Sequence, residues 1–291
     1  MKKTNKIFNV FLLAALAFTV LGIVFSTLAL FLTYTEFRAN IKVNSVHSIL
    51  FIVFTSLAFL LPIAQAIVIK DYKVTRAKDD MLFVKIAAVL SILSLAVLAF
   101  YDLIMISKGV ISIPTRFETW KFFRMAIILP TVASLFFNLL PAKTKISPFI
   151  RYACALAPIA YCLFSNLSIY FNPGPGPVPE FFRITFSVAY IFGALFFLYD
   201  FKWNSLESST RVYVALTTIF ISLGFITSIS SIIFILFANL TKGHTMVNVF
   251  EAFALLLLSI YALSKLIALK RAVEITANSE IQKSDTPPAK N

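Results

Sequence analysis

Long apolar runs alternate with short polar segments along the whole chain. The apolar runs, bounded by charged and turn-forming residues, are 7–34, 48–69, 82–106, 122–141, 150–171, 181–200, 212–238 and 248–269. Each run has the roughly 20 residues that a helix needs to cross a hydrocarbon core of about 30 Å. Because that core offers no water to backbone amides, each segment must satisfy them internally as a helix. The pattern therefore predicts an all-α, polytopic integral membrane bundle of about eight transmembrane helices.

The polar connections are short, so residues 1–269 are expected to form a single transmembrane domain. No connection exceeds about 16 residues, which is too short for a soluble domain with its own core. Residues 270–291 are polar, contain two prolines and are predicted to form a disordered cytoplasmic tail. The first apolar run is longer than the roughly 7 to 15 residues of a secretory signal core, so we expect an uncleaved span.

The composition strengthens the membrane assignment and adds a large positive charge. Hydrophobic residues make up 59% of the chain, and 26 Lys and Arg against 13 Asp and Glu give a formal net charge of +13. In so apolar a chain, basic residues favour contact with anionic lipid headgroups over contact with nucleic acid. The expected partners are therefore the lipid bilayer and its anionic inner-leaflet lipids, with no nucleic acid.

The distribution of Lys and Arg predicts the orientation, because basic residues in short loops are retained on the cytoplasmic side. With the N-terminus inside, fifteen bases lie in inner segments: Lys2, Lys3, Lys6, Lys70, Lys73, Arg76, Lys78, Lys143, Lys145, Lys202, Arg211, Lys270, Arg271, Lys283 and Lys290. Six lie in outer segments: Arg38, Lys42, Lys108, Arg116, Lys121 and Lys242. The imbalance predicts a cell-membrane protein with both termini in the cytoplasm.

A few ionisable residues fall inside the predicted spans, and Asp102 is the hardest for a membrane to accommodate. Its short side chain lies about one turn inside span 82–106, so it must find a partner or take up a proton. Arg124, Arg183 and Glu251 are predicted at the same depth, near the outer ends of their spans. We predict that Asp102 pairs with Arg124 or Arg183, and that these residues form a polar cluster with Glu251. The alternative is that Arg124, Arg183 and Glu251 extend to interfacial water.

Two further residues are secondary candidates for a site. His47 lies at the outer start of span 48–69, and Lys265 lies near the inner end of span 248–269. A long lysine side chain in that position is expected to reach the phosphates of the inner leaflet.

Small and polar residues form a face along span 212–238, where Gly224 and Ser228 are one helical turn apart. Helices in lipid associate through close backbone approach at such small residues. We interpret this face as a packing surface and expect a neighbouring helix close to Gly224.

Catalytic and metal-binding motifs are absent from the sequence. There is no HExxH, GxSxG, Walker A or GxGxxG pattern. The two histidines, His47 and His244, cannot form a histidine-rich metal site, and Cys154 and Cys162 are about 12 Å apart along one helix, too far for a disulfide. No cofactor and no metal are predicted.

The sequence leaves two functional interpretations open. The first is a small-solute or ion transporter or channel with its site at Asp102, Arg124, Arg183 and Glu251. The second is a non-catalytic membrane sensor, assembly factor or partner subunit that binds another membrane protein. An intramembrane enzyme is disfavoured because no nucleophile and base occur together.

Overall fold

A computed structural model describes residues 2–36, 46–68, 82–107, 119–140, 147–171, 180–205, 209–237 and 249–284. The regular secondary structure of these residues is entirely helical: α1 (Lys2–Glu36), α2 (Val46–Val68), α3 (Leu82–Ser107), α4 (Thr119–Phe137), α5 (Pro148–Phe171), α6 (Glu180–Ser205), α7 (Thr210–Phe237) and α8 (Val249–Ser284). Each of the eight described helices contains a segment long and apolar enough to cross a membrane. The predicted polytopic helix bundle is confirmed.

The helix ends lie close to the predicted span ends except in α8. This helix continues to Ser284, whereas the predicted span ends at residue 269 and is followed by a predicted disordered tail. Extending a helix that already exists needs no new nucleation, and the residues that follow include the good helix formers Ala, Glu and Arg. The backbone is therefore helical over part of the predicted tail, while residues 285–291 lie outside the described residues.

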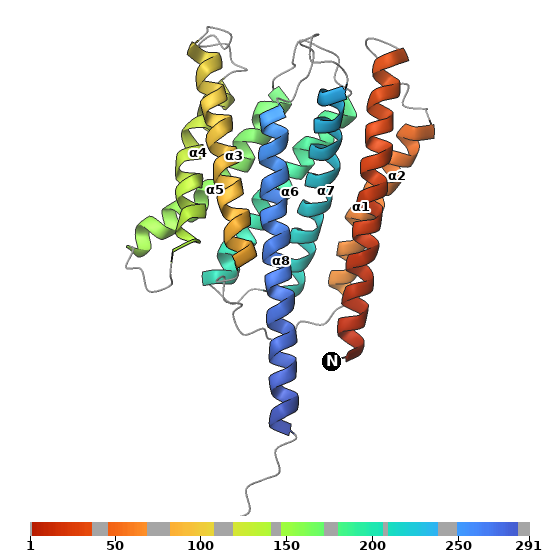
Figure 1. Ribbon diagram of the computed structural model, residues 1–291, viewed down its shortest axis with the longest axis vertical. Coiled ribbons are helices and arrows are strands. Elements are labelled where there is room, and N and C mark those ends of the chain that lie inside the picture. Colours follow the sequence, from red (N-terminus) through yellow and green to blue (C-terminus); the bar gives the residue numbers. More distant parts are fainter. Residues whose placement is uncertain are drawn as a thin grey trace, which may run out of the picture.

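Helices α3 to α8 pack in a closed ring. Each of them contacts the next one along the chain, and α8 packs back on α3. Polar contacts reinforce the closure: Ser91 of α3 donates a hydrogen bond to the Leu257 carbonyl of α8 (3.0 Å), and Asn138 after α4 donates to the Tyr261 hydroxyl of α8 (3.1 Å). The remaining helices, α1 and α2, pack on each other and on α7, at the right of the bundle in Figure 1.

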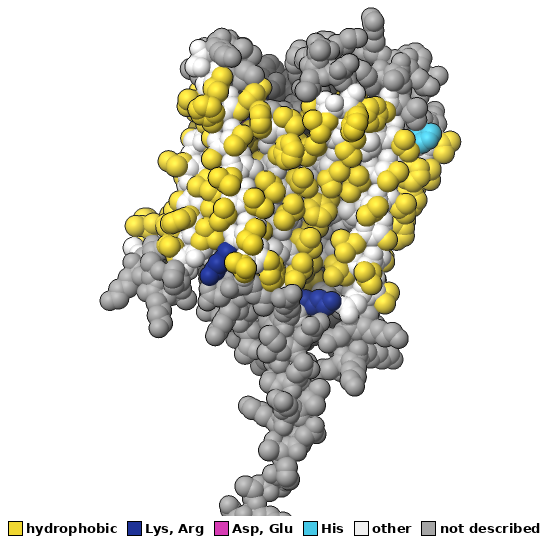
Figure 2. Space-filling model, in the orientation of Figure 1, with side chains coloured by type: hydrophobic (Ala, Val, Ile, Leu, Met, Phe, Trp, Pro, Cys, Tyr) yellow, Lys and Arg dark blue, Asp and Glu magenta, His cyan; other side chains and the backbone are white. Residues whose placement is uncertain are grey.

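The outer surface of the bundle is apolar. Large side chains such as Leu129, Phe237 and Ile67 are each at least three-quarters exposed. Figure 2 shows hydrophobic side chains over nearly the whole described face, with Lys and Arg side chains only at its lower margin. A soluble protein rarely exposes so large a continuous apolar patch, whereas a lipid bilayer covers it. The chain is therefore a multi-pass membrane protein.

Both ends of the described chain lie at the same end of the bundle. The N-terminal end of α1 and the C-terminal end of α8 point downwards in Figure 1. The assignment of that end to the cytoplasm remains a prediction from the distribution of basic residues.

Gly224 of α7 lies in close contact with Ser259 of α8. A Cβ atom at Gly224 would lie 3.0 Å from the Cβ of Ser259 and even closer to its hydroxyl, which donates a 2.8 Å hydrogen bond to Leu255. We expect Gly224→Ala to lower the unfolding temperature of the purified protein in detergent. Overpacking costs about 1 to 3 kcal/mol, which exceeds the roughly 1 kcal/mol that alanine gains over glycine in a helix.

Gly22 of α1 supplies a matched control. A Cβ atom at Gly22 would meet the flexible end of the Ile226 side chain at 2.7 Å, and this end can rotate away. Gly22→Ala should therefore change the unfolding temperature less than Gly224→Ala. Equal shifts for the two variants would contradict a tight α7–α8 contact.

Candidate functional site: a buried ionic triad

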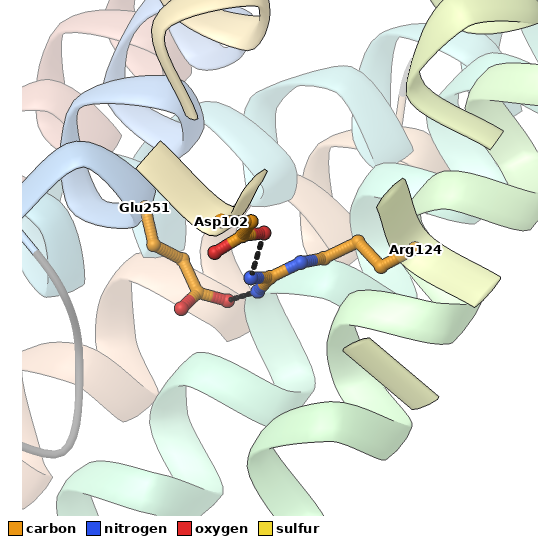
Figure 3. Close-up of polar contacts among 3 residues, drawn as sticks. All are labelled: Asp102, Arg124 and Glu251. Atoms are coloured by element: carbon orange, nitrogen blue, oxygen red, sulfur yellow. Dashed lines mark hydrogen bonds and ion pairs between the residues drawn. The ribbon is translucent and has the colours of Figure 1, made fainter. Parts of the chain in front are cut away.

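Three charged side chains from three helices meet inside the bundle. Arg124 of α4 donates two charge-assisted hydrogen bonds, from Nη2 to Asp102 Oδ2 (2.7 Å) and from Nη1 to Glu251 Oε1 (2.5 Å) (Figure 3). Asp102 belongs to α3 and Glu251 to α8. We call Asp102, Arg124 and Glu251 the triad. One guanidinium group thus holds two carboxylates at once, which its planar set of donors allows.

The topology brings these residues to the same depth. Asp102 lies near the C-terminal end of α3, whereas Arg124 and Glu251 lie near the N-terminal ends of α4 and α8. Because α4 and α8 both pack on α3, their N-terminal ends lie beside the C-terminal end of α3. The structure therefore brings together three of the four residues predicted for the cluster, with Arg124 as the partner of Asp102.

The triad is removed from solvent and carries unequal charge. Exposed fractions are 4% for Asp102, 2% for Arg124 and 6% for Glu251. Arg124 and Glu251 contact each other inside the bundle, so the alternative that they extend to interfacial water is wrong. With all three groups ionised, two carboxylates against one guanidinium leave a net charge of −1. A net charge in a low-dielectric interior carries a large desolvation cost.

Two buried tyrosines lie beside the triad. Tyr161 of α5 and Tyr190 of α6 are fully buried with ring centres 6.3 Å apart, and both interact electrostatically with Arg124 and Glu251. Within the described chain, the Tyr190 hydroxyl and Arg124 Nε have no hydrogen-bond partner, while the hydroxyls of Tyr161 and Ser165, one turn apart on α5, interact with each other. Buried polar groups of this kind normally have partners. The neighbourhood of the triad therefore has spare hydrogen-bonding capacity.

These tyrosines were not predicted as members of the candidate site. The available signal was their position on helical faces that also carry serine: Tyr161 lies one turn before Ser165, and Tyr190 lies three residues after Ser187. Such a face marks a helix interface, but it does not indicate which charged residue lies across from it.

Arg183 and His47 occupy other places. The guanidinium carbon of Arg183, in α6, lies 6.0 Å from the ring centre of Tyr170, near the end of α5. His47 is half-buried in the first turn of α2, a helix that packs mainly on α1 and α7. Neither residue is among the three side chains joined in the triad.

Lys265 belongs to a second buried polar cluster. Its Nζ lies 3.7 Å from Asp200 Oδ2 of α6, and the Tyr213 hydroxyl of α7 donates a 3.0 Å hydrogen bond to Asp200 Oδ1. We call Asp200, Tyr213 and Lys265 the Asp200 cluster. Lys265 is only 4% exposed, so the prediction that its ammonium group reaches the lipid phosphates is wrong. Inside the bundle, the ammonium group pairs with the buried Asp200 carboxylate instead of with a lipid phosphate.

The two clusters lie far apart along α8. Lys265 follows Glu251 by 14 positions (265 − 251), which corresponds to about 21 Å at 1.5 Å per residue. Helix α8 therefore takes part in an ionic contact near each end of its membrane-spanning segment.

The described residues contain no group of three or more His, Cys, Asp and Glu side chains able to hold a metal ion. Both carboxylates of the triad are already in contact with Arg124. No protein-family model matches the chain, and neither a curated protein nor a solved structure is significantly similar to it. The class of protein, a multi-pass membrane protein, therefore follows from the fold and the apolar surface, and a specific role has to be argued from the triad.

Proposed function

We propose that this protein transports a small solute or ion across the cell membrane, with the triad as part of the translocation pathway and both termini in the cytoplasm. The observation that carries the proposal is the presence of three ionisable side chains, each at most 6% exposed, within membrane-spanning helices. Ionisable residues facing the interior of a membrane bundle usually mark the path of an ion, a proton or a substrate.

Stability alone does not account for the triad. Replacing a buried ionic group by well-packed apolar side chains is often neutral or stabilising, because desolvation offsets most of the Coulomb attraction. Helix association in this bundle is already served by close contacts such as that between Gly224 and Ser259. A function that uses the charges explains why the bundle retains them.

The arrangement of the triad suits a site that opens and closes. Its charges come from three different helices, so a relative movement of α3, α4 and α8 changes or breaks the contacts. If the ion pairs of the triad break, the freed charged groups can bind a solute. When the ion pairs form again, the site closes. Helix ion pairs with two discrete arrangements are one physical means of producing such a switch.

Transport is tested with purified protein reconstituted into liposomes that contain a pH-sensitive dye or a sodium-sensitive dye. We expect flux of one of these cations, under an imposed membrane potential, above that of protein-free liposomes. Asp102→Asn and Glu251→Gln should each abolish the flux, because each changes the charge of the triad. Arg183→Gln, outside the triad, is the matched control and should retain most of the flux.

A wild-type protein without proton or sodium flux would count against cation transport. If a second membrane protein also co-purified in stoichiometric amount, the result would favour the partner-subunit interpretation instead. Size-exclusion profiles of each variant before reconstitution establish that loss of flux does not reflect loss of the folded protein.

A further inference from the structure

We infer that the triad binds one exchangeable proton, shared between Asp102 and Glu251, and that this proton is the cation coupled to transport. The inference rests on the proposed function for its role in transport, but the proton site itself follows from charge and geometry. The proton site identifies which cation is bound, whereas the presence of buried charges alone leaves the cation unidentified.

Charge balance is the first reason to expect a bound proton. Asp102 and Glu251 supply two negative charges and Arg124 supplies one positive charge, so the ionised triad is one positive charge short of neutrality. An uncompensated charge in a membrane interior is strongly disfavoured, and a carboxyl group avoids that cost by taking up a proton. Binding of one proton makes the triad neutral, whereas a second proton would leave a net positive charge.

The position of the carboxylate oxygens is the second reason. Each carboxylate contacts Arg124 through one oxygen, and no hydrogen bond joins its other oxygen to the guanidinium group (Figure 3). A proton on Asp102 Oδ1 or Glu251 Oε2 therefore leaves both contacts with Arg124 in place. The site can gain and lose a proton without first being taken apart.

The two buried tyrosine hydroxyls beside the triad are the third reason. Tyr161 and Tyr190 are both 0% exposed and interact electrostatically with Glu251. A hydroxyl group can donate a hydrogen bond to an ionised carboxylate and can accept one from a protonated carboxyl group. The two tyrosines can therefore serve the site in both protonation states, a capacity that a purely structural ion pair does not require.

The tyrosine and cysteine side chains around the triad do not change this charge balance. Tyr101 in α3, Cys162 in α5, and Tyr161 and Tyr190 in α5 and α6 are neutral in their ordinary protonation states. In α7, which also packs on α8, Arg211 and Tyr213 lie at the end that carries the Asp200 cluster. Among the side chains that the structure describes, the remaining charged ones at this end of these helices are Lys121, near the start of α4, and Arg183, near the start of α6. Both are partly exposed, so their charges are screened more strongly than those of the buried triad.

A single bound cation of another kind would satisfy the same charge balance, and sodium is the alternative that the test must separate. Sodium needs several oxygen ligands at once, and the triad offers only the one oxygen of each carboxylate that Arg124 does not contact, so neighbouring hydroxyl groups would have to move in to complete the set. A proton needs only one carboxylate oxygen, so it fits the described contacts without rearrangement.

The experiment is infrared difference spectroscopy of the full-length protein in lipid, titrated with acid and base. We expect one pH-dependent carboxylic-acid carbonyl band that the exposed carboxyl groups do not account for. Asp102→Asn and Glu251→Gln should each remove the whole band, because either change leaves one carboxylate against one guanidinium and the triad is then neutral without a proton. Arg183→Gln, as the control, should leave the band unchanged.

The two single variants make the outcome decisive. If the band survives in either variant, the proton belongs to one residue alone and the shared site is wrong. If the band also persists in Asp102→Asn/Glu251→Gln, the proton lies outside the triad. Loss of the band on addition of sodium chloride at constant pH would show that sodium is the bound cation and would overturn the inference.

The infrared result and the flux result are separable. A titrating band without flux would support the proton site and contradict transport. Proton flux without a band from the triad would support transport and overturn the proton site. If one variant fails to fold, the other single variant carries the same prediction.

Discussion

Arg124→Gln is expected to destabilise the protein more than either Gly224→Ala or Lys265→Met. It leaves Asp102 and Glu251, only 4% and 6% exposed, without the cation that both of them contact. Removal of one partner from a buried ion pair costs about 3 to 5 kcal/mol, and here one guanidinium serves two carboxylates, so we expect the upper part of that range. The measurement is the thermal unfolding midpoint of the purified protein in detergent at neutral pH.

A further variant distinguishes loss of stability caused by unpaired charges from general misfolding of Arg124→Gln. The triple variant Asp102→Asn/Arg124→Gln/Glu251→Gln should recover most of the stability, since no unpaired charge remains. Arg183→Gln is the matched arginine control. A midpoint for Arg124→Gln no lower than that of Arg183→Gln would contradict the assignment of the triad.

Lys265→Met is expected to give the second largest loss, about 3 kcal/mol. Methionine keeps much of the volume of lysine but removes the ammonium group that lies 3.7 Å from Asp200. The carboxylate is then left with the hydrogen bond from Tyr213 and no opposite charge. Because the Asp200 side chain is 10% exposed, water relieves part of the cost, so we expect a smaller effect than for Arg124→Gln. Thermal unfolding in detergent again provides the measurement.

Lys202→Met is the control for the lysine substitution. Lys202 is exposed on α6, and its ammonium group lies 5.3 Å from the ring centre of Tyr199. Its removal should shift the midpoint only slightly. The double variant Asp200→Asn/Lys265→Met should be more stable than Lys265→Met alone, because it removes the uncompensated charge. Equal stability of these two variants would show that the ion pair contributes nothing measurable.

The helical spans could be predicted well from the sequence because each helix forms its backbone hydrogen bonds within its own residues. No knowledge of neighbouring helices is needed to recognise an apolar segment such as 82–106, and α3 indeed covers Leu82–Ser107. The end of α8 could not be placed in the same way, because hydrophobicity marks the edge of the membrane and not the end of the helix.

The sequence predicted the depth of the site residues in the membrane, but it did not predict which of them are neighbours. Asp102 required a partner because its side chain is short, and Arg124 and Glu251 lay at matching depth. The choice between Arg124 and Arg183 depends on which helix packs beside α3, and lateral packing is not encoded in any one span. Asp200 was missed because a carboxylate at the end of a span resembles an ordinary boundary charge.

The ring of α3 to α8 also has a consequence for biosynthesis. The chain emerges from its N-terminus, so α3 and α4 are made long before α8 closes the ring. Asp102 and Arg124 belong to consecutive helices, and their charges compensate each other as soon as this hairpin forms. Glu251 arrives with the last helix, so the second carboxylate, and the need for a proton to neutralise it, is added only when α3 to α7 are already present. The order of synthesis therefore leaves the earlier membrane-inserted intermediates with a balanced pair of charges.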